Sequence, residues 1–156
     1  CYNRRALQDK LPEEIERAQR YHRPLAVVFM DIDHFKQFND QHGHQLGDEV
    51  LRSAAKHVAG TLRQGVDWIA RYGGEEFVLV LPETPLEAAI AIAHRLCDAL
   101  PQHAVPNPRG GSVYISASFG VTAYRPGEDA LALLSRADTL VYQAKSAGRQ
   151  QVVAGA

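Results

Sequence analysis

The chain lacks a long hydrophobic run, a signal peptide and a cysteine framework. None of its apolar segments approaches the roughly 20 residues that a membrane-spanning helix needs. Its two cysteines, Cys1 and Cys97, form neither a disulfide pattern nor a zinc-site pattern. Cys97 lies in an apolar helical stretch, where we expect a small buried side chain. These absences favour the reducing cytoplasm, and they leave open whether a parent protein is anchored in a membrane.

The sequence also lacks an excess of charge, an internal repeat and a low-complexity tail. Its formal net charge is −1, which argues against a protein that coats a nucleic-acid polymer through bulk electrostatics. Local lysine and arginine side chains, or a metal, can still bind a few phosphates. The 156 residues are 46% hydrophobic, enough for one compact domain with a buried core. Because no initiator methionine precedes Cys1, we expect residues 1–156 to be one domain of a longer protein, with a sensory region upstream.

Hydrophobic periodicity and turn residues predict alternating helices and strands. Leu25–Ile32 is a continuous apolar run, and its length suits a central strand covered on both faces. Two short strands, Trp68–Tyr72 and Phe77–Leu81, flank a tight hairpin of two glycines and two glutamates. The other predicted elements are helices around Leu7–Ala18, Lys36–Gln41, Val50–Leu62, Leu86–Leu100 and Ala130–Ser146, and strands at Val113–Tyr124 and Val152–Val153.

Single residue types predict several smaller features. Gly43 and Gly47 are expected to break the short helix, and Gly120 is expected to form a bulge in its strand. Asp129 is placed to cap the last helix. Residues 101–112 are rich in proline and glycine, which indicates a loop.

The order of the central elements is strand, helix, strand, strand, helix, strand. This order is that of a ferredoxin-like βαββαβ sandwich, an α+β fold with a central antiparallel sheet flanked by helices. Nucleotidyl cyclases and polymerase palms have this architecture. We expect the two helices of the βαββαβ unit to pack on one face of the sheet.

Asp31 lies at the end of the predicted first strand, one residue inside the apolar run. An unpaired charge there would be costly, and a metal or a buried cation would remove that cost. Asp33 has the simpler interpretation of a helix cap. If the first strand and the hairpin are neighbours, Asp31 and Glu75 meet as hard oxygen ligands of the kind that Mg²⁺ prefers.

The hairpin has two interpretations. Gly73 and Gly74 allow positive backbone φ and a close approach of another group to the main chain. Glu75 and Glu76 are adjacent like charges, which are common in an exposed acidic turn. Since Phe77 begins a buried strand at once, we expect at least one of the two carboxylates to point back along the sheet.

The hairpin resembles the signature of the GGDEF family of diguanylate cyclases, in the variant with Glu in place of Asp. Its residues are Arg71-Tyr72-Gly73-Gly74-Glu75-Glu76-Phe77. The resemblance covers nearly the whole chain and identifies it as similar to an isolated C-terminal catalytic domain. Further segments match family motifs in order: Tyr2–Arg5, Asp31–Lys36, Asn39-Asp40, Gly43-His44, Gly47-Asp48, Ser118–Val121, Ala137-Asp138 and Lys145–Arg149.

The resemblance implies that the domain condenses two GTP into cyclic di-GMP and two pyrophosphates, across a homodimer. It implies two Mg²⁺ or Mn²⁺ ions in each active half-site, held by Asp31, the Ile32 carbonyl, Glu75 and Glu76. Glu76 and Glu75 would be the catalytic carboxylates. Whether Glu76 binds the second metal or accepts the 3′-hydroxyl proton stays open.

The resemblance also implies a nucleotide site. Asp48 and Asn39 would hydrogen-bond the guanine edge, whose donor pattern adenine lacks. Simpler interpretations remain, because Asn39 can end a helix, Asp48 can cap one, and basic residues stabilise a helix C-terminus. The triphosphate would contact Lys36, Lys145, Arg149 and, at a helix start, the main-chain amides of His34 and Phe35.

The chain departs from the family pattern just before the hairpin. Many members carry an inhibitory product site, Arg-x-x-Asp, and Asp67 lies at the matching distance from Gly73. Gln64 stands at the arginine position, and Arg63 is one residue away. A neutral amide does not replace a guanidinium that pairs bidentately with phosphate. We therefore predict that this inhibitory site is degenerate and that high-affinity feedback is lost.

Two other functions remain open at the level of sequence. The first is a catalytically silent receptor for GTP or cyclic di-GMP, which usually shows decay of the hairpin signature. The second is an unrelated nucleotidyl cyclase or polymerase palm, which shares the logic of paired metal-binding carboxylates. The intact hairpin and Asp31 favour the enzyme, with no nucleic-acid polymer as partner and no membrane contact by this domain.

Overall fold

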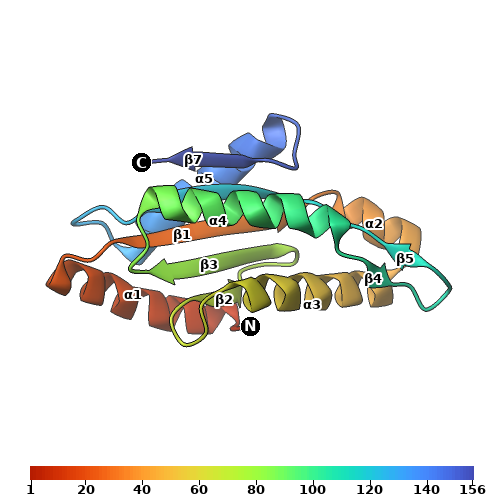
Figure 1. Cartoon of the computed structure of the whole chain (residues 1–156), viewed down its shortest axis with the longest axis horizontal. Helices are drawn as coiled ribbons and strands as arrows, with labels where there is room; N and C mark the ends of the chain where they lie inside the picture. The colour runs from red at the N-terminus through yellow and green to blue at the C-terminus, as the bar shows by residue number, and fades with distance from the viewer.

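A five-stranded sheet forms the centre of the fold (Figure 1). The computed structural model describes residues 1–156. The strand order is β2-β3-β1-β6-β7, in which β1 pairs antiparallel with β3 and β6, and β2 pairs antiparallel with β3. The added strand β7 runs parallel to β6 at one edge. The bounds are β1 Leu25–Ile32, β2 Trp68–Arg71, β3 Glu76–Pro82, β6 Ala117–Ala123 and β7 Val152–Gly155.

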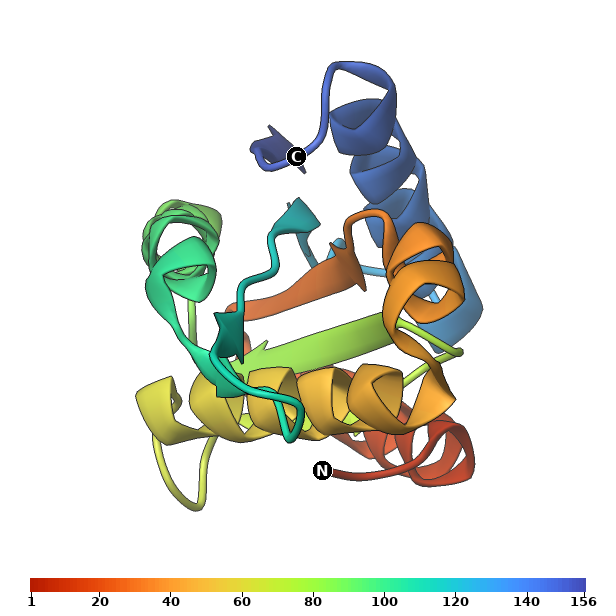
Figure 2. The same ribbon diagram turned by 90° about the vertical axis from the view of Figure 1, so that its right-hand side faces the viewer.

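Helices cover both faces of the sheet. The main helices are α1 Arg4–Tyr21, α2 Phe35–His42, α3 His44–Thr61, α4 Leu86–Ala99 and α5 Ala130–Ser146. Viewed as in Figure 2, the central strands lie between α4 on one side and α5 on the other. The two helices of the βαββαβ unit, α3 and α4, pack on one face as predicted, and α1 and α5 cover the other. This arrangement confirms the α+β sandwich.

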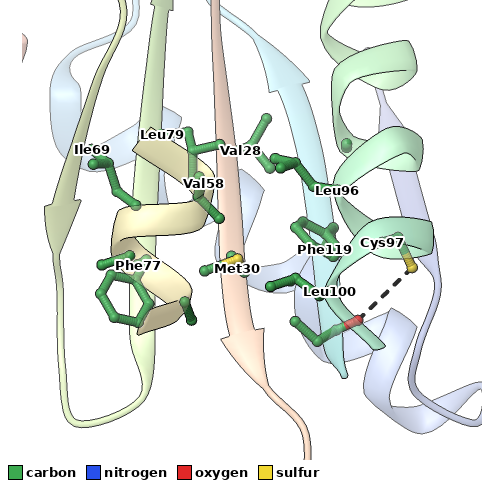
Figure 3. Close-up of a cluster of buried hydrophobic side chains, with 14 of the residues drawn as sticks. Val28, Met30, Val58, Ile69, Phe77, Leu79, Leu96, Cys97, Leu100 and Phe119 are labelled. Atoms are coloured by element: carbon green, nitrogen blue, oxygen red, sulfur yellow. Dashed lines mark hydrogen bonds between the residues drawn. The ribbon is translucent and has the colours of Figure 1, made fainter. Parts of the chain in front are cut away.

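The central strand β1 divides its side chains between two cores. Val28 and Met30 belong to the core under α3 and α4, which Figure 3 shows in close-up. Val27 and Phe29 belong to the core under α1 and α5. Alternate side chains of a strand point to opposite faces, so a run buried on both faces must be apolar throughout. This explains why the apolar run coincides with β1, and Cys97 is buried in the first core as expected.

Two glycines have roles that differ from the prediction. Gly47 lies inside α3 rather than ending a helix, and only Gly43 separates α2 from α3. A Cβ at Gly47 would collide with the side-chain oxygen of Asn39. Gly120 forms no bulge, because it pairs with Phe29 in a continuous register. Both glycines instead allow close packing between elements, which a sequence pattern does not distinguish from a break.

The predicted strand at 113–124 is shorter than expected. Its first part forms β5 (Ser112–Val113), which pairs with β4 (Val105–Pro106) in a small separate hairpin after a 3₁₀ turn at Leu100–Gln102. At the start of α5, Asp129 accepts a hydrogen bond from the Ala132 amide at 2.8 Å, which confirms the predicted cap.

No helix of the fold combines the length and the apolar character needed to cross a membrane.

Candidate active site

The end of β1 and the hairpin meet side by side. Asp31 pairs with Glu76 in the antiparallel register of β1 and β3. One residue further, the Ile32 amide donates to the Glu75 carbonyl at 3.1 Å. The predicted adjacency of the first strand and the hairpin is therefore confirmed. It brings carboxylates from two distant parts of the sequence to one end of the sheet.

The turn of the hairpin is held by hydrogen bonds to its carbonyl groups. The Arg71 guanidinium donates to the carbonyls of Gly73, at 3.1 Å, and of Gly74, at 2.7 and 3.0 Å. The Tyr72 amide donates to the Glu76 carbonyl at 2.8 Å. These bonds restrain the main chain of the turn, so the backbone positions of Glu75 and Glu76 are fixed.

Gly73 and Gly74 do not adopt the positive φ that the sequence suggested. The expected close approach is present instead, because a Cβ at Gly73 would collide with the Glu76 carboxylate. Nothing lies near the corresponding position of Gly74. The glycine at 73 therefore serves the placement of Glu76, since any side chain there would displace that carboxylate.

Asp31 is half-buried and carries the largest resolved pKa change in the site. The pKa of Asp31 is raised to about 6, because burial and, to a smaller degree, the charges of Glu75 and Asp33 outweigh the lowering effect of Lys145. The Lys145 ammonium lies 2.8 Å from Asp31 Oδ1. This buried oxygen has no hydrogen-bond donor aligned with it. The compensating cation comes from α5, far away in the sequence.

Glu76 lies close to the same acidic side chains as Asp31. Burial raises its pKa, and the charges of Asp31, Asp138 and Glu75 add to the rise, while Arg4 opposes it. Sequence reasoning assigned no role to Asp138 or Arg4. Asp138 comes from α5 and Arg4 from α1, and only the packing of these helices on the sheet brings their charges to the hairpin.

The acidic side chains suit a hard divalent cation without forming a ready-made cage. No three histidine, cysteine or acidic side chains surround a common point. Asp31 nevertheless presents a buried oxygen without an aligned donor, and the charges of Glu75 and Glu76 repel it. Carboxylate oxygens are the ligands that Mg²⁺ takes in proteins. The donor set therefore fits the metal that the sequence predicts.

Asp33 does not cap a helix, so that prediction was wrong. Its carboxylate accepts hydrogen bonds from the hydroxyls of Ser116 and Ser118, each at 2.6 Å, and from the Gln150 amide at 3.1 Å. The helix α2 begins after His34, whose φ of 56° makes the turn without a side-chain cap. Asp33 thus ties the end of β1 to β6 and to the segment that follows α5.

The predicted phosphate-binding residues surround this end of the sheet. His34 and Phe35 stand at the start of α2, where the first amides of a helix have no intrahelical partner. Lys145 reaches Asp31, whereas the side chains of Lys36 and Arg149 are exposed and form no ion pair. The structure therefore brings Lys145 into the acidic site and leaves the other two cations facing solvent.

Asn39 and Asp48 lie in different surroundings. The side-chain oxygen of Asn39 is buried without a hydrogen-bond partner, beneath Gly47. Asp48 is exposed within α3 and does not cap it, since that helix begins at His44. Asp48 lines a cavity of about 410 Å³ together with Arg71. The exposed carboxylate of Asp48 is open to a ligand, whereas the Asn39 oxygen is buried and has no donor.

Asp67, which belongs to the product site predicted to be degenerate, has a partner inside the fold. Asp67 is only 2% exposed and accepts hydrogen bonds from the Arg63 guanidinium at 2.7 and 2.9 Å and from the Arg63 amide at 2.9 Å. Arg63 also donates to the Pro82 carbonyl and to the Thr84 hydroxyl. Gln64 is exposed and contacts none of these groups. The carboxylate of Asp67 is therefore already satisfied inside the fold.

Comparison with known proteins agrees with this geometry. Residues 1–151 match the family described as diguanylate cyclase, GGDEF domain. The chain is 42% identical to the diguanylate cyclase DgcP of Pseudomonas aeruginosa over 96% of its own length, and 40% identical to the response regulator PleD of Caulobacter vibrioides over 97%. It spans 22% of DgcP and 34% of PleD.

Solved structures share the fold. The diguanylate cyclase SiaD of Pseudomonas aeruginosa, in complex with its activator SiaC, has a TM-score of 0.92 at 39% identity, over 98% of this chain and 58% of that one. The GGDEF domain of DgcB from Caulobacter crescentus, in complex with c-di-GMP, has a TM-score of 0.91 at 31% identity, over 97% and 87%. The hairpin, the first strand and these relatives all indicate the same family. The chain belongs to the family of diguanylate cyclase GGDEF domains.

Proposed function

We propose that this domain condenses two GTP molecules into cyclic di-GMP with release of two pyrophosphates. The observation that carries the proposal is the pairing of Asp31 with Glu76 across adjacent strands, at the end of the sheet where Lys145 also lies. Phosphoryl transfer needs acidic groups, a cation for phosphate charge and a nucleotide site within reach of one another. This end of the sheet supplies the acidic groups and the cation, and the nucleotide would bind beside them.

Asp31, the Ile32 carbonyl, Glu75 and Glu76 would hold two Mg²⁺ or Mn²⁺ ions in each half-site, meaning the site of one domain. Bound there, the metal would lower the pKa of the 3′-hydroxyl and neutralise phosphate charge. Glu76 either binds the second ion or accepts the 3′-hydroxyl proton, and a bound cation would oppose the rise in the pKa of its carboxylate.

Lys145 would bind the triphosphate. Without a nucleotide its ammonium pairs with Asp31, and a phosphate offers it several anionic oxygens. Lys36, Arg149 and the amides of His34 and Phe35 would complete the phosphate site at the start of α2.

Guanine recognition is assigned to Asp48 and Asn39. A carboxylate accepts from the N1–H and 2-amino groups of guanine, and adenine lacks that pair of donors. We expect GTP to be preferred over ATP for this reason. The Asn39 oxygen is buried and outside the cavity that Asp48 lines, so a contact with the base would require the Asn39 side chain to turn outward.

Catalysis would require two domains that face each other across a two-fold axis. Each 3′-hydroxyl then points at the α-phosphate bound by the partner domain, and both bonds form in equivalent half-sites. A region outside residues 1–156 would drive this association, consistent with the greater length of the relatives. We place the reaction in the cytoplasm, where GTP is available.

The rate of cyclic di-GMP formation from GTP and Mg²⁺, measured over a range of domain concentrations, tests this function. The rate per domain should rise with concentration and then level off. Glu76→Gln should lower the rate by about 100- to 10,000-fold. Glu83→Gln is the matched control, because Glu83 is exposed and pairs with Arg23. No product from the wild-type chain, even when dimerised artificially, would contradict the proposal.

A further inference from the structure

Arg71 makes an arrangement that the proposed chemistry does not use. Its Nε donates to the carbonyls of both Gly73 and Gly74, and its Nη2 donates to Gly74. These two glycines directly precede Glu75 and Glu76. One guanidinium therefore fixes the part of the backbone that leads into the acidic pair.

The other two carbonyls of the turn do not depend on a side chain. The Glu75 carbonyl accepts from the Ile32 amide, and the Glu76 carbonyl accepts from the Tyr72 amide. Only the carbonyls of Gly73 and Gly74 are held by a side chain, that of Arg71, which has several rotatable bonds. Arg71 is therefore the side chain whose hydrogen bonds hold the carbonyls of Gly73 and Gly74.

The guanidinium also faces a cavity. Arg71 and Asp48 both line the space of about 410 Å³ next to α3 and the N-terminal segment. The main chain of Arg71 is fixed, since its amide donates to the Tyr2 carbonyl at 2.8 Å. Its Nη1 has no hydrogen-bond partner in the protein. The Nε and Nη2 groups thus hold the turn, and Nη1 is free in a side chain that lines the same cavity as Asp48.

The chemistry of this cavity matches one base. Asp48 accepts hydrogen bonds, and the free Nη1 of Arg71 donates them. Guanine offers donors at N1 and the 2-amino group and acceptors at O6 and N7, and arginine is a common partner of those acceptors. Adenine has an amino group where guanine has O6, so it would place a hydrogen-bond donor against the donors of the arginine.

We propose that Arg71 is a positioning residue that couples guanine in the Asp48 cavity to the backbone of the Gly73-Gly74 turn. The binding of a guanine nucleotide is taken from the proposed function. The new part is that Arg71 links the bound base to the hairpin. A guanine that takes the free edge of the guanidinium changes how the other edge holds the two carbonyls. The acidic pair is then set for reaction only when the correct base is present.

An NMR titration with GDP tests the coupling without turnover, because GDP lacks the γ-phosphate and so cannot release pyrophosphate. In the wild-type domain, GDP should shift the amide signals of Asp48, Gly74 and Glu75. In Arg71→Lys the Asp48 signal should still shift, while those of Gly74 and Glu75 should not. Lysine keeps the charge and cannot bridge two carbonyls in one plane.

Arg52→Lys is the matched control. Arg52 lines the same cavity but pairs with Glu49 and makes no contact with the turn. The shifts at Gly74 and Glu75 should persist in this variant. If they also persist in Arg71→Lys and Arg71→Ala, or if GDP fails to shift Asp48 in the wild type, the inference is overturned.

Kinetics supply the second readout. In Arg71→Ala, kcat should fall on the order of 100-fold, because a small displacement of catalytic groups has effects of that size. The Kd for GDP should rise only as far as the loss of one hydrogen bond to the base explains, roughly tenfold. A rise in Kd that accounts for the whole loss, with kcat unchanged, would make Arg71 an ordinary binding residue. A wild type that binds GDP with the expected shifts but makes no product would refute the proposed function and leave the coupling standing.

Discussion

Gly73 lies directly against the carboxylate of Glu76, with no room for a side chain between them. The turn does not use the positive φ that glycine allows. The absence of a Cβ at this position is what lets the Glu76 carboxylate fold back over the hairpin. A purely local property of one residue therefore sets the place of the proposed catalytic group.

Gly73→Ala should lower cyclase activity on the order of 100-fold, because the new methyl group displaces the Glu76 carboxylate. Gly74→Ala should stay close to the wild type, since nothing surrounds a Cβ at that position. Initial rates and circular dichroism of the two variants check this prediction. Equal losses in both variants would mean that the turn needs flexible glycines rather than space at one of them.

Gly120→Ala should destabilise the domain by about 1–3 kcal/mol, because the added methyl group meets the main chain of α5 at Ala137 and Val141. Gly60→Ala, in an open position of α3, should stabilise it by about 0.5–1 kcal/mol. Urea denaturation measures both values. An unchanged midpoint for Gly120→Ala would show that α5 has room to move away from the sheet.

Product feedback should be weak in this chain. Gln64 stands where an arginine would be needed, and the Asp67 carboxylate is already bound by Arg63. Calorimetry with cyclic di-GMP should find binding that Asp48→Ala reduces, because the guanine-reading half-site is then the main place for the product. Tight binding that requires Asp67 and ignores Asp48→Ala would refute this prediction.

Stability should fall in acid partly through His57. Its ring stacks on His103 at 4.5 Å, and burial followed by the charge of His103 lowers the pKa of His57 below its ordinary 6.5. The unfolded chain therefore binds the proton first as pH falls, so the free energy of unfolding decreases below about pH 6.5. Above that pH both states are neutral and the contribution is complete.

Urea denaturation from about pH 8 to about pH 5 measures this effect as the difference between the wild type and His57→Gln. The difference should change with pH only in the acidic half of the range. His94→Gln, at an exposed position on α4, serves as the control. A pH profile of His57→Gln that runs parallel to that of the wild type would rule out this titration.

The local parts of the fold could be predicted from the sequence. The apolar run coincides with β1 because a strand buried on both faces must be apolar throughout. The last helix coincides with Ala130–Ser146 because Asp129 caps it. The adjacency of β1 and the hairpin also followed, although the prediction brought Asp31 to Glu75 and the register pairs it with Glu76.

The parts that depend on packing could not be predicted. Asp33 has the sequence context of a helix cap, yet it binds serines 83 and 85 residues away. Gly47 and Gly120 have the pattern of breaks, yet they allow close contact between elements. The pairing of Lys145 with Asp31 depends on how α5 lies on the sheet. Each of these relations arises only once helices are placed on strands.

In the proposed mechanism, each Glu76 serves one half-site of a two-domain cyclase. Mass spectrometry of the nucleotides formed from GTP by a mixture of wild type and excess Glu76→Gln tests it most directly. Mixed dimers form only one of the two bonds, so the linear dinucleotide should accumulate early, whereas the wild type alone gives cyclic di-GMP. A mixture that yields only cyclic product, in proportion to the wild-type chain present, would contradict the claim.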